Sequence, residues 1–405
     1  MMQPDPMKIL QLCNKPPLPA KDGGCIAMNN ITRGLIAAGH QVKILTIFTH
    51  KHEFDPDSLP GDYLDQTRIE GVFVDTRINV VDAFSNFMTA DSYNVSRFFS
   101  TDFDIKLTNT LQKEDFDIVH VESLFMTSYI GTVRRMSSAA IILRSHNLEF
   151  VIWEKIARGT SQLARRTYLK YLSRKLKEYE LSMLGQVDGI AAISEEDKSH
   201  FRKLGSKKPM VTIPFGIPLD EYAPAEEEPE LALFHIGAMD WSPNLEGILW
   251  FLEEVWPLIN SNFPQLRFYL AGRNMPQFLV DTPHPNVFFC GEVENAADFM
   301  RSKSIMVVPL LSGGGIRVKI IEGMALEKAI VSTSLGAEGI DFEKDKNILI
   351  ADNPQQWLEA IRSLVVDPSL VKKLGQEGKA LVASKYDNAV ITKELLTFYR
   401  SLIKA

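Results

Sequence analysis

Short apolar runs alternate with longer amphipathic stretches along almost the whole chain. Each run is continuous rather than alternating, which is typical of parallel strands that are buried on both faces, and the stretches between runs have helical periodicity. A first set of predicted strands lies at residues 8–12, 42–46, 117–121, 140–143, 189–193 and 210–213. A second set lies at residues 231–236, 267–270, 286–289, 304–308, 329–332 and 348–350. The pattern predicts an α/β fold with two Rossmann-like domains.

A polar, proline-rich segment with a short acidic run separates the two sets of strands. Its composition does not favour a helix or a strand, so we expect a linker at residues 218–230. The N-terminal domain is then residues 1–217 and the C-terminal domain residues 231–387, followed by a final helix over 388–405. A chain of 405 residues is long enough to build two separate cores.

A glycine triplet, Gly313, Gly314 and Gly315, follows a predicted strand and precedes an apolar-periodic helix. Backbone N–H groups gather at such a helix start, where the helix dipole is positive, and together they attract anions. Arg317 and Lys319 lie in or just before the first turn, where cations are unfavourable unless an anion is bound. A guanidinium fork and a mobile ammonium suit phosphate oxygens, so the segment predicts a phosphate or diphosphate site.

A plainer interpretation of the same segment is a flexible connection. Lys319 and Glu322 are then an ordinary ion pair three residues apart on the helix. The two interpretations differ in geometry, because Arg317 and Lys319 can reach one anion only if the helix begins near Arg317.

In the N-terminal half, polar side chains follow two predicted strands directly. His146 comes after the run at 139–143, and His120 and Glu122 come after residues 117–119. The carboxyl ends of parallel strands are where ligands bind in such sheets, so we expect His146 in an active site, with a structural hydrogen bond as the alternative. For His120 and Glu122, contact with an acceptor and support of neighbouring residues are equal alternatives.

A second glycine pair, Gly23 and Gly24, follows the first predicted strand and opens a helix that ends near Gly39. This pair is either a ligand-binding loop or a simple turn.

Composition and charge narrow the function classes. The net charge of −7 argues against nucleic acid as a partner. Three cysteines, Cys13, Cys25 and Cys290, are too few and too scattered for a disulfide framework or a zinc site. The pattern contains no membrane-spanning run and no signal-peptide pattern, so we expect a soluble, cytoplasmic protein.

The glycine triplet with Arg317 and Lys319, together with Glu322-Gly323-Met324-Ala325 and the run at 328–333, resembles the retaining GT-B glycosyltransferases of family 4. These enzymes share a C-terminal domain called glycosyl transferases group 1, and the resemblance covers nearly the whole chain. The family's first motif glutamate falls on Gly314, so the chain resembles the branch with a Gly-Gly-Gly-x-Arg-x-Lys loop. The resemblance implies two facing domains with an interdomain cleft and a C-terminal helix that crosses back to the N-terminal domain.

The resemblance also implies roles for individual residues. His146 approaches the donor sugar, and Gly23 and Gly24 lie between the donor diphosphate and the acceptor. Val293 belongs to a loop that holds the nucleotide base through backbone contacts, and Glu322 accepts hydrogen bonds from the ribose hydroxyls.

The cations for the diphosphate are unusual in this chain. Many family members carry an arginine and a lysine in the loop after the first strand of the C-terminal domain, here residues 237–244, and this chain has neither. We therefore expect Arg317 and Lys319 to stabilise the leaving diphosphate. Arg273, after another strand, is either a further positive charge at the site or an ordinary surface arginine.

The implied activity is metal-independent transfer of a sugar, with retention, from a nucleotide-diphosphate donor to a hydroxyl of a glycan or lipid-linked acceptor. UDP- and GDP-sugars are the expected donors, no cofactor or metal is expected, and cell-surface polysaccharide or glycolipid synthesis is the expected setting. Two alternatives remain, a GT-B nucleotide-sugar epimerase and a non-catalytic nucleotide-sugar binding protein. A dinucleotide-dependent dehydrogenase is disfavoured, because residues 12–17 lack the Gly-x-Gly-x-x-Gly pattern.

A basic amphipathic helix is expected over residues 158–180. Its arginines and lysines are interleaved with leucines and tyrosines, a pattern that fits contact with an anionic membrane at its inner face and access to a lipid-linked acceptor. The alternative is a solvated helix face.

Overall fold

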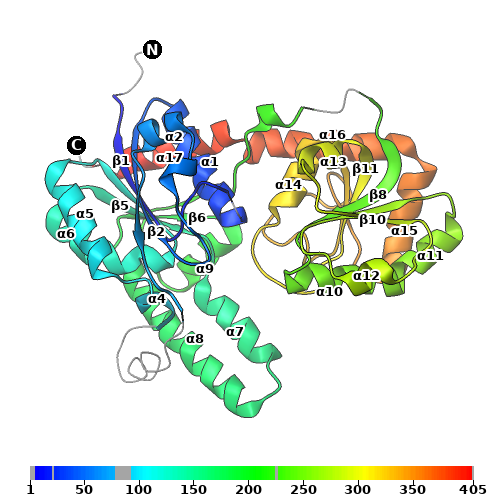
Figure 1. The fold of residues 1–405 in the computed structure, drawn as a ribbon, viewed down its shortest axis with the longest axis horizontal. Coiled ribbons are helices and arrows are strands. Elements are labelled where there is room, and N and C mark those ends of the chain that lie inside the picture. The colour runs from blue at the N-terminus through cyan, green and yellow to red at the C-terminus, as the bar shows by residue number, and fades with distance from the viewer. Residues whose placement is uncertain (1–4, 21, 78–92, 224–226, 404–405) are drawn as a thin grey trace. The chain divides into compact units, whose positions relative to one another are not determined.

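The computed structural model describes residues 5–20, 22–77, 93–223 and 227–403. The chain divides into two compact units, Met1–Gly216 together with Ile391–Ala405, and Ile217–Val390. Each unit contains one parallel sheet covered by helices (Figure 1). The prediction of two Rossmann-like domains is thus confirmed. The segment predicted as a linker falls in the second unit, and its residues 224–226 lie outside the described part of the chain.

The first sheet has seven parallel strands in the order β3-β2-β1-β4-β5-β6-β7. The strands are β1 (Lys8–Cys13), β2 (Gln41–Phe48), β3 (Glu70–Phe73), β4 (Ile118–Glu122), β5 (Ala140–Ser145), β6 (Gly189–Ala192) and β7 (Met210–Thr212). Strand β3 has no counterpart among the predicted strands. It lies at the sheet edge and is only partly buried, so its sequence lacks the continuous apolar run that marks the other strands.

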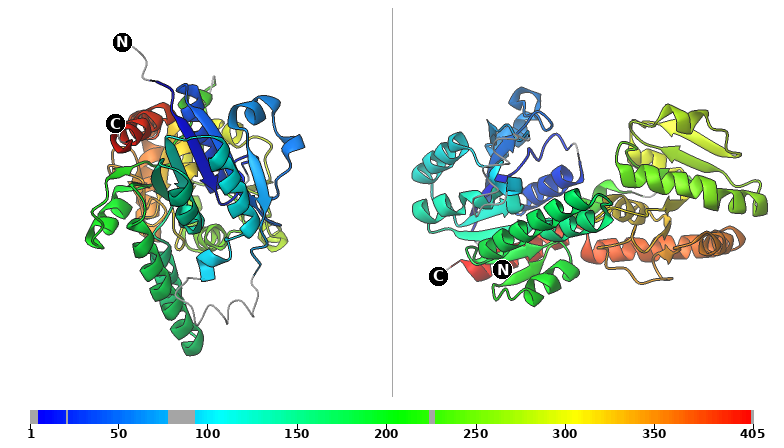
Figure 2. Two further views of the ribbon diagram at one scale, coloured as in Figure 1. Left: turned by 90° about the vertical axis from the view of Figure 1, so that its left-hand side faces the viewer. Right: turned by 90° about the horizontal axis from the view of Figure 1, so that it is seen from below.

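Helices cover both faces of the first sheet (Figure 2). One apolar core contains residues of β1, β2, α1 (Gly23–Ala37), α2 (Gly61–Thr67) and α17 (Asn388–Leu402). The other core contains residues of α5 (Thr101–Lys113), α6 (Ile130–Met136), α7 (Glu149–Gly159), α8 (Leu163–Leu184) and α9 (Glu195–Lys203). The remaining short elements are η1 (Pro56–Ser58), α4 (Tyr93–Ser96) and η2 (Leu124–Tyr129). The last helix, α17, begins in the second unit and from Ile391 onward packs with the first.

The predicted basic helix over 158–180 coincides with α8 from Leu163 onward, whereas residues 158 and 159 end α7. Helix α7 ends at Gly159 and α8 begins at Leu163, so the chain turns back at residues 160–162 and forms a helical hairpin. The hairpin projects from the first unit (Figures 1 and 2). The predicted helix is confirmed over residues 163–180, but its predicted start at residue 158 was wrong, because the glycine and three polar residues at 159–162 favour a turn over another helical turn.

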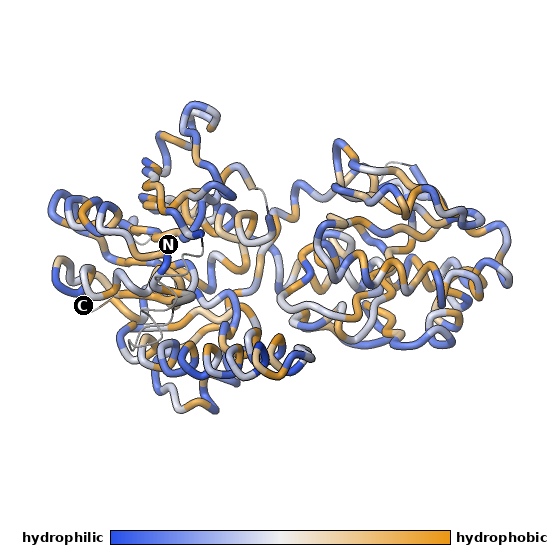
Figure 3. Tube along the Cα trace, turned by 60° about the horizontal axis from the view of Figure 1, so that its bottom comes forward, coloured by the Kyte–Doolittle hydropathy of each residue, from blue (hydrophilic) through white to orange (hydrophobic). Residues whose placement is uncertain are grey.

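The second sheet has six parallel strands in the order β10-β9-β8-β11-β12-β13. They are β8 (Glu230–Ile236), β9 (Phe268–Ala271), β10 (Val287–Gly291), β11 (Lys303–Val308), β12 (Ala329–Ser332) and β13 (Leu349–Ile350). The helical elements are η3 (Leu219–Glu221), α10 (Ser242–Trp250), η4 (Phe251–Val255), α11 (Trp256–Asn262), α12 (Gln277–Asp281), α13 (Ala296–Arg301), α14 (Val318–Ala325), α15 (Pro354–Val366) and α16 (Pro368–Lys385). The trace coloured by hydropathy shows apolar segments inside each unit (Figure 3).

Candidate functional site

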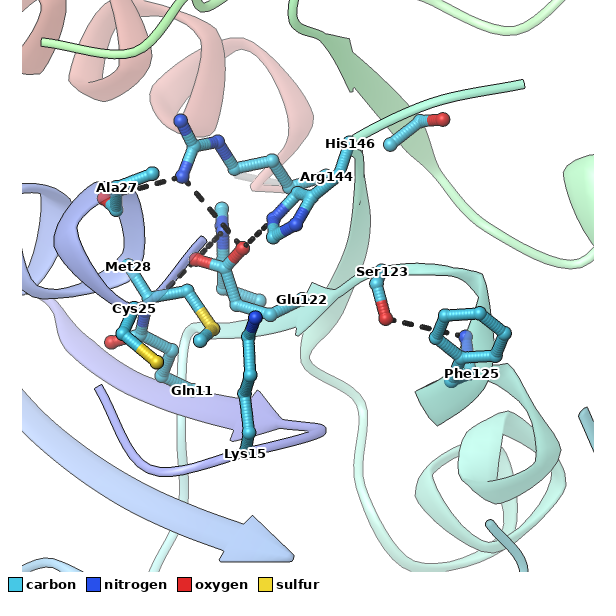
Figure 4. Close-up of polar contacts among 12 residues, drawn as sticks. Gln11, Lys15, Cys25, Ala27, Met28, Glu122, Ser123, Phe125, Arg144 and His146 are labelled. Atoms are coloured by element: carbon cyan, nitrogen blue, oxygen red, sulfur yellow. Dashed lines mark hydrogen bonds and ion pairs between the residues drawn. The ribbon is translucent and has the colours of Figure 1, made fainter. Parts of the chain in front are cut away.

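The carboxyl end of the first sheet holds a buried polar cluster around Glu122, the last residue of β4 (Figure 4). One carboxylate oxygen, Oε2, lies 2.7 Å from Nε2 of His146. The other, Oε1, accepts a hydrogen bond from Nε2 of Gln11 at 2.9 Å and lies 3.1 Å from Nε2 of His120. Every oxygen of the carboxylate therefore has a donor beside it, which is the condition for burying such a group without a large penalty.

Arg144 supplies the opposite charge. It lies on β5 directly beside Glu122 in the register of the sheet, and its Nη1 is 3.7 Å from Oε2 of Glu122. Both side chains are fully buried. Burial by itself would raise the pKa of Glu122, but Arg144 and the neighbouring histidines hold it well below its usual value. Glu122 is therefore ionised at neutral pH.

His146 lies in the loop after β5 and is the exposed end of this cluster. About 13% of its side chain is exposed, whereas Glu122 is completely covered. Its ring packs edge-on against Phe215, at 6.1 Å between ring centroids. Burial lowers the pKa of His146, and Glu122 opposes that effect only in part. At neutral pH the imidazole is neutral, and because Glu122 can only accept, Nε2 carries the hydrogen and Nδ1 carries the lone pair.

The positions of His120 and Glu122 disagree with one of their two predicted roles, direct contact with an acceptor. Neither side chain has any exposed area, so neither can contact an acceptor in this conformation. His120 is instead held between Glu122 and Tyr399 of α17, whose hydroxyl lies 2.5 Å from Nδ1 of His120. The geometry fits the other alternative, in which these two residues support His146.

Gln11 and Tyr399 belong to this cluster but were not among the predicted site residues. Gln11 had a usable signal, since it is a polar residue within an otherwise apolar strand, where a buried amide needs partners. Tyr399 had none, because nothing in the pattern of α17 distinguishes it from the other apolar positions that pack on the sheet.

The glycine pair after β1 begins helix α1, as predicted, with Asp22 as its N-cap. The carboxylate of Asp22 accepts from the backbone N–H of Cys25 at 3.0 Å, and Nζ of Lys15 binds both of its oxygens at 2.7 Å. Burial would raise the pKa of Asp22, but Lys15 lowers it to about 2. Gly24 lies close to this ion pair, since a Cβ there would come within 2.8 Å of Nζ of Lys15. Lys21, in the same loop, lies outside the described residues.

Within the described ranges of the chain, one group of side chains has the spacing of metal ligands. Its members are Asp22, Cys25 and His52, whose ligand atoms all lie within 4.8 Å of one another. The ammonium of Lys15 already neutralises the carboxylate of Asp22, and burial raises the pKa of the Cys25 thiol. A thiol that keeps its proton and a carboxylate that holds a lysine are poor cation ligands, so the residues do not fit a metal site.

In the second unit, the glycine triplet lies between β11 and α14, as predicted. Gly313 and Gly315 have φ values of +101° and +84°, which favour glycine, whereas a Cβ on Gly314 would meet nothing within 4 Å. Helix α14 begins at Val318, so Arg317 occupies its N-cap position. This late start is the geometry that allows Arg317 and Lys319 to approach one anion.

The guanidinium of Arg317 is almost fully buried, with 5% of the residue exposed. Its Nη1 donates to the carbonyl oxygens of Gly314 and Gly315, and the group lies over the ring of Trp241, with Cζ 5.3 Å from the ring centroid. Its Nε and Nη2 are buried without a hydrogen-bond partner among the described residues. Buried donors without partners are rare in folded proteins and mark a place where a ligand or water belongs.

Lys319 points from the first turn of α14 towards the loop after β8. Its Nζ donates to the carbonyl oxygen of Ile236 at 3.0 Å and to Oδ1 of Asn244 at 2.9 Å, and it lies 3.3 Å from Nε2 of His235. Burial and the charge of Arg317 lower the pKa of Lys319 to about 7. The absence of cations from residues 237–244 is thus offset by a lysine that reaches this loop from α14.

Glu322 lies one turn further along α14. Its Oε1 accepts a hydrogen bond from the hydroxyl of Tyr222 at 2.9 Å, and burial raises its pKa. Tyr222 comes from the segment predicted as linker, so a sequence pattern could not connect the two residues. Among the described residues, Lys319 donates to neutral acceptors and Glu322 binds Tyr222, so the two do not form the plain ion pair of the alternative interpretation.

The two remaining predicted donor residues lie at strand ends of the second sheet. Arg273 follows β9 and is exposed, and Val293 follows β10 and is half-buried. The structure shows no side-chain contact that distinguishes Arg273 from a surface arginine. None of the described helices is both long enough and apolar enough to cross a membrane.

Comparison with known proteins supports the predicted resemblance in both halves of the chain. The family model of the glycosyltransferases of family 4 matches residues 23–221, and that of the glycosyl transferases of group 1 matches residues 230–367. Among curated proteins, an uncharacterized 44.6 kDa protein from the cps region of Klebsiella pneumoniae is 22% identical over 400 residues, 94% of this chain and 97% of that protein. The capsular polysaccharide biosynthesis glycosyltransferase CapM of Staphylococcus aureus is 28% identical over 136 residues, 31% of this chain and 34% of CapM.

Solved structures show the same fold over the full length. Sucrose-phosphate synthase from Thermosynechococcus elongatus aligns with a TM-score of 0.72 and 18% identity, covering 98% of this chain and 99% of that one. Anabaena HepE in complex with UDP aligns with a TM-score of 0.66 and 12% identity, covering 98% and 100%. At these identities the likeness shows the fold, which is GT-B. Since the two family models account for most of the chain and the fold agrees with them, we conclude that the chain belongs to the group 1 glycosyltransferases.

Proposed function

We propose that this glycosyltransferase moves a sugar from a nucleotide-diphosphate donor to a hydroxyl of a glycan or lipid-linked acceptor, with retention of configuration and without a metal ion. The observation that carries the proposal is the pair of cations at the start of α14. Arg317 is buried with two donor nitrogens that have no hydrogen-bond partner in the described part of the chain, and Lys319 is buried in a setting that favours its neutral form. Both features are costly for the empty protein, and an anion with several oxygens would relieve both.

The leaving diphosphate explains why these cations would favour catalysis. As the bond from the sugar to the diphosphate breaks, negative charge grows on the phosphate oxygens. Fixed positive charge at Arg317 and Lys319, together with the N–H groups of Gly313, Gly314 and Gly315, would stabilise that charge more in the transition state than in the ground state. In this proposal Glu322 binds the ribose, and Val293 and Arg273 lie near the rest of the nucleotide.

His146 and the glycine pair Gly23 and Gly24 are the proposed contribution of the first unit. A neutral imidazole with its Nδ1 lone pair available can accept a hydrogen bond from a sugar hydroxyl, and Glu122 keeps the ring in that tautomer. Gly23 and Gly24, at the start of α1, allow a close approach of backbone to ligand.

The setting that we propose is polysaccharide or glycolipid synthesis at a membrane surface. Two relatives support it by their descriptions, one from a cps region and one from capsular polysaccharide biosynthesis. The α7–α8 hairpin adds a physical reason, since residues 155–177 contain eight lysines and arginines and no aspartate or glutamate in a chain with a net charge of −7. Such a surface is attracted to anionic lipids.

The test is binding of UDP, GDP, ADP and their sugars to the purified protein by calorimetry, with and without a chelator, followed by transfer to a lipid-linked acceptor. We expect one nucleotide to bind, chelator to leave its affinity unchanged, and the product to keep the donor's anomeric configuration. Loss of binding with chelator would overturn metal independence, and failure of all three nucleotides would overturn the donor class. Donor turnover without an acceptor would instead identify an epimerase.

A second candidate, a non-catalytic nucleotide-sugar binding protein, follows from Gly314, which stands where the family has a glutamate. The same experiment separates it from a transferase, because that protein would bind the donor and show no turnover with any acceptor.

A further inference from the structure

A continuous series of four side chains connects the C-terminal helix to His146. The hydroxyl of Tyr399 on α17 lies 2.5 Å from Nδ1 of His120, and Nε2 of His120 lies 3.1 Å from Oε1 of Glu122. The other carboxylate oxygen of Glu122 lies 2.7 Å from Nε2 of His146. Tyr399 is 279 positions from His120 in the chain, so folding, not sequence proximity, assembles the series.

Burial divides the series into an inner part and one exposed end. Tyr399, His120 and Glu122 have no exposed area, whereas His146 keeps about 13% of its side chain exposed. Hydrogen bonds in a water-free interior are strong and strongly directional, because no solvent competes for their donors and acceptors. Loss of the Tyr399 hydroxyl would therefore alter the hydrogen bonds of His120 and Glu122, because no water molecule is available to replace it.

The hydrogens in the series can be placed from chemistry. Burial raises the pKa of Tyr399 well above its usual value, so its hydroxyl keeps a hydrogen that must be donated. Its hydrogen-bond partner is Nδ1 of His120, which must then accept, so Nδ1 carries no hydrogen and the ring hydrogen is on Nε2. Nε2 donates to Glu122, which cannot donate in return because it is ionised.

The reverse arrangement fails at the carboxylate. If Nδ1 of His120 donated to Tyr399, Nε2 of the neutral ring would need a donor, and the ionised Glu122 offers none. Only one direction satisfies the three bonds with neutral rings, and in that direction Glu122 also receives the Nε2 hydrogen of His146. The orientation of His120 thus fixes Oε1 of Glu122 and leaves Oε2 directed at His146.

We propose that Tyr399 is a positioning residue for His146 and acts through His120 and Glu122. Its hydrogen bond to Nδ1 fixes the position of the His120 ring, so that Nε2 is directed at Oε1 of Glu122, and the carboxylate in turn holds His146 with its hydrogen on Nε2 and its lone pair on Nδ1. The ring of Tyr399 also packs edge-on against His120, at 5.9 Å between ring centroids, which adds a second contact between the two side chains. For its effect on turnover, the inference rests on the proposed role of His146 in transfer.

The test compares Y399F with Y63F. Tyr63 is a matched control because it is also buried in the apolar core shared by α1, α2 and α17, and its hydroxyl has no hydrogen-bond partner among the described residues. Both variants remove one buried hydroxyl and keep the ring. We expect Y399F to lower kcat about tenfold with KM for the donor little changed, as for other residues that orient a histidine, while Y63F retains wild-type kcat.

A second measurement does not depend on transfer. Nitrogen NMR of the imidazole rings reports which ring nitrogen of each histidine carries the hydrogen. Because the ionised Glu122 can only accept, we expect both histidines to be Nε2-protonated in all three proteins. We expect the ring-nitrogen resonances of His120 and His146 to shift in Y399F, where Nδ1 of His120 loses the hydroxyl of Tyr399, and to stay at their wild-type positions in Y63F. If Y399F matches Y63F in both kcat and the ring-nitrogen resonances of His146, the positioning role is overturned. If the wild type transfers no sugar, the proposed function fails, and the NMR comparison still decides the role of Tyr399.

Discussion

The ammonium nitrogen of Lys319 lies 2.9 Å from the amide oxygen of Asn244, so a lysine at the start of α14 is held by the loop that follows β8. The carbonyl oxygen of Ile236 is a second acceptor at 3.0 Å. Both acceptors are neutral, and burial together with Arg317 lowers the pKa of Lys319 to about 7. The lysine is therefore close to half charged at neutral pH in the empty protein.

Binding of a nucleotide diphosphate should take up a proton at Lys319. The anion favours the charged ammonium and raises its pKa, so above pH 7 the empty site is mostly neutral and must gain a proton when the ligand binds. We expect affinity to fall as the pH rises from 7 to 9, with proton uptake visible as a dependence of the calorimetric enthalpy on the ionisation enthalpy of the buffer. K319M should remove the uptake. Equal enthalpies in all buffers for the wild type would contradict this prediction.

Removing either cation should weaken binding of the nucleotide diphosphate. A lost charge-assisted hydrogen bond costs about 1.5–3 kcal/mol, so we expect R317A and K319A each to weaken affinity by about tenfold or more, measured by calorimetry. K346A is the control, because Lys346 is exposed and pairs with Glu343 in the same unit. Unchanged affinity in R317A and K319A would rule out an anion site at the start of α14.

Substitution by alanine should lower the melting temperature at one glycine of the second unit and leave it unchanged at another. At Gly272, with φ +158°, a Cβ would lie 1.8 Å from the carbonyl oxygen of Gly237, so G272A must displace the backbone of the loop that holds Lys319. At Gly314 a Cβ would meet nothing within 4 Å. We expect G272A to lower the melting temperature and G314A to leave it unchanged. A stable G272A would contradict the close approach of these two loops.

G314A then tests the glycine triplet as a binding loop. Since the substitution is accommodated by the fold, a loss of nucleotide affinity in G314A would come from the added methyl group at the ligand, not from unfolding. Wild-type affinity would place the ligand away from Gly314.

The sequence predicted the strands well because buried parallel strands are continuous apolar runs. It predicted the late start of α14 as a condition for anion binding, and the structure meets that condition at Val318. It missed the edge strand β3, whose residues are only partly buried, and the turn that divides α7 from α8. Strand β3 escapes the pattern because its residues are only partly buried, whereas the turn had a local signal in the glycine and three polar residues at 159–162.

In the polar clusters, too, some residues could be predicted from the sequence and others could not. His146, Glu122 and Arg317 could be singled out because they follow strands or a glycine loop. Tyr399 and Tyr222 could not, since each meets its partner only through the fold, over 279 and 100 positions respectively. The complete burial of His120 is a further feature that no pattern of a single strand can specify.

The α7–α8 hairpin should bind anionic membranes. Leu163 and Tyr168 near its turn are 71% and 45% exposed, and Arg165 and Arg166 lie between them. Apolar side chains with adjacent cations suit the headgroup region of an anionic bilayer. We expect co-sedimentation with vesicles that contain phosphatidylglycerol, weaker binding at high salt, and loss of binding in R165E/R166E. K372E/K373E, a double charge reversal in the second unit, is the control, and equal loss in both variants would contradict a specific role of the hairpin.

Glu180 should make the stability of the protein depend on pH. Helix α7 begins without a side-chain N-cap of its own, and Oε2 of Glu180 on α8 accepts from the backbone N–H of Phe150 at 3.4 Å. Despite that hydrogen bond, burial and the neighbouring Glu149 raise the pKa of Glu180 from 4.5 to about 8, and burial raises that of Glu149 to about 7. Two carboxyl groups thus lie at the start of the helix that follows the His146 loop.

The sign of the effect follows from the raised pKa values. The folded state holds its protons up to about pH 7 to 8, whereas an unfolded glutamate releases them near 4.5, so the stabilisation is complete below pH 4.5 and is lost between there and pH 8. E180Q keeps an acceptor for Phe150 but cannot ionise. We expect the free energy of unfolding to fall by on the order of 2 kcal/mol more in the wild type than in E180Q between pH 5 and pH 9, measured by denaturant titration. E178Q, at an exposed position on the same helix, should behave as the wild type, and parallel pH profiles for the wild type and E180Q would show that Glu180 is ionised in the folded protein throughout this range.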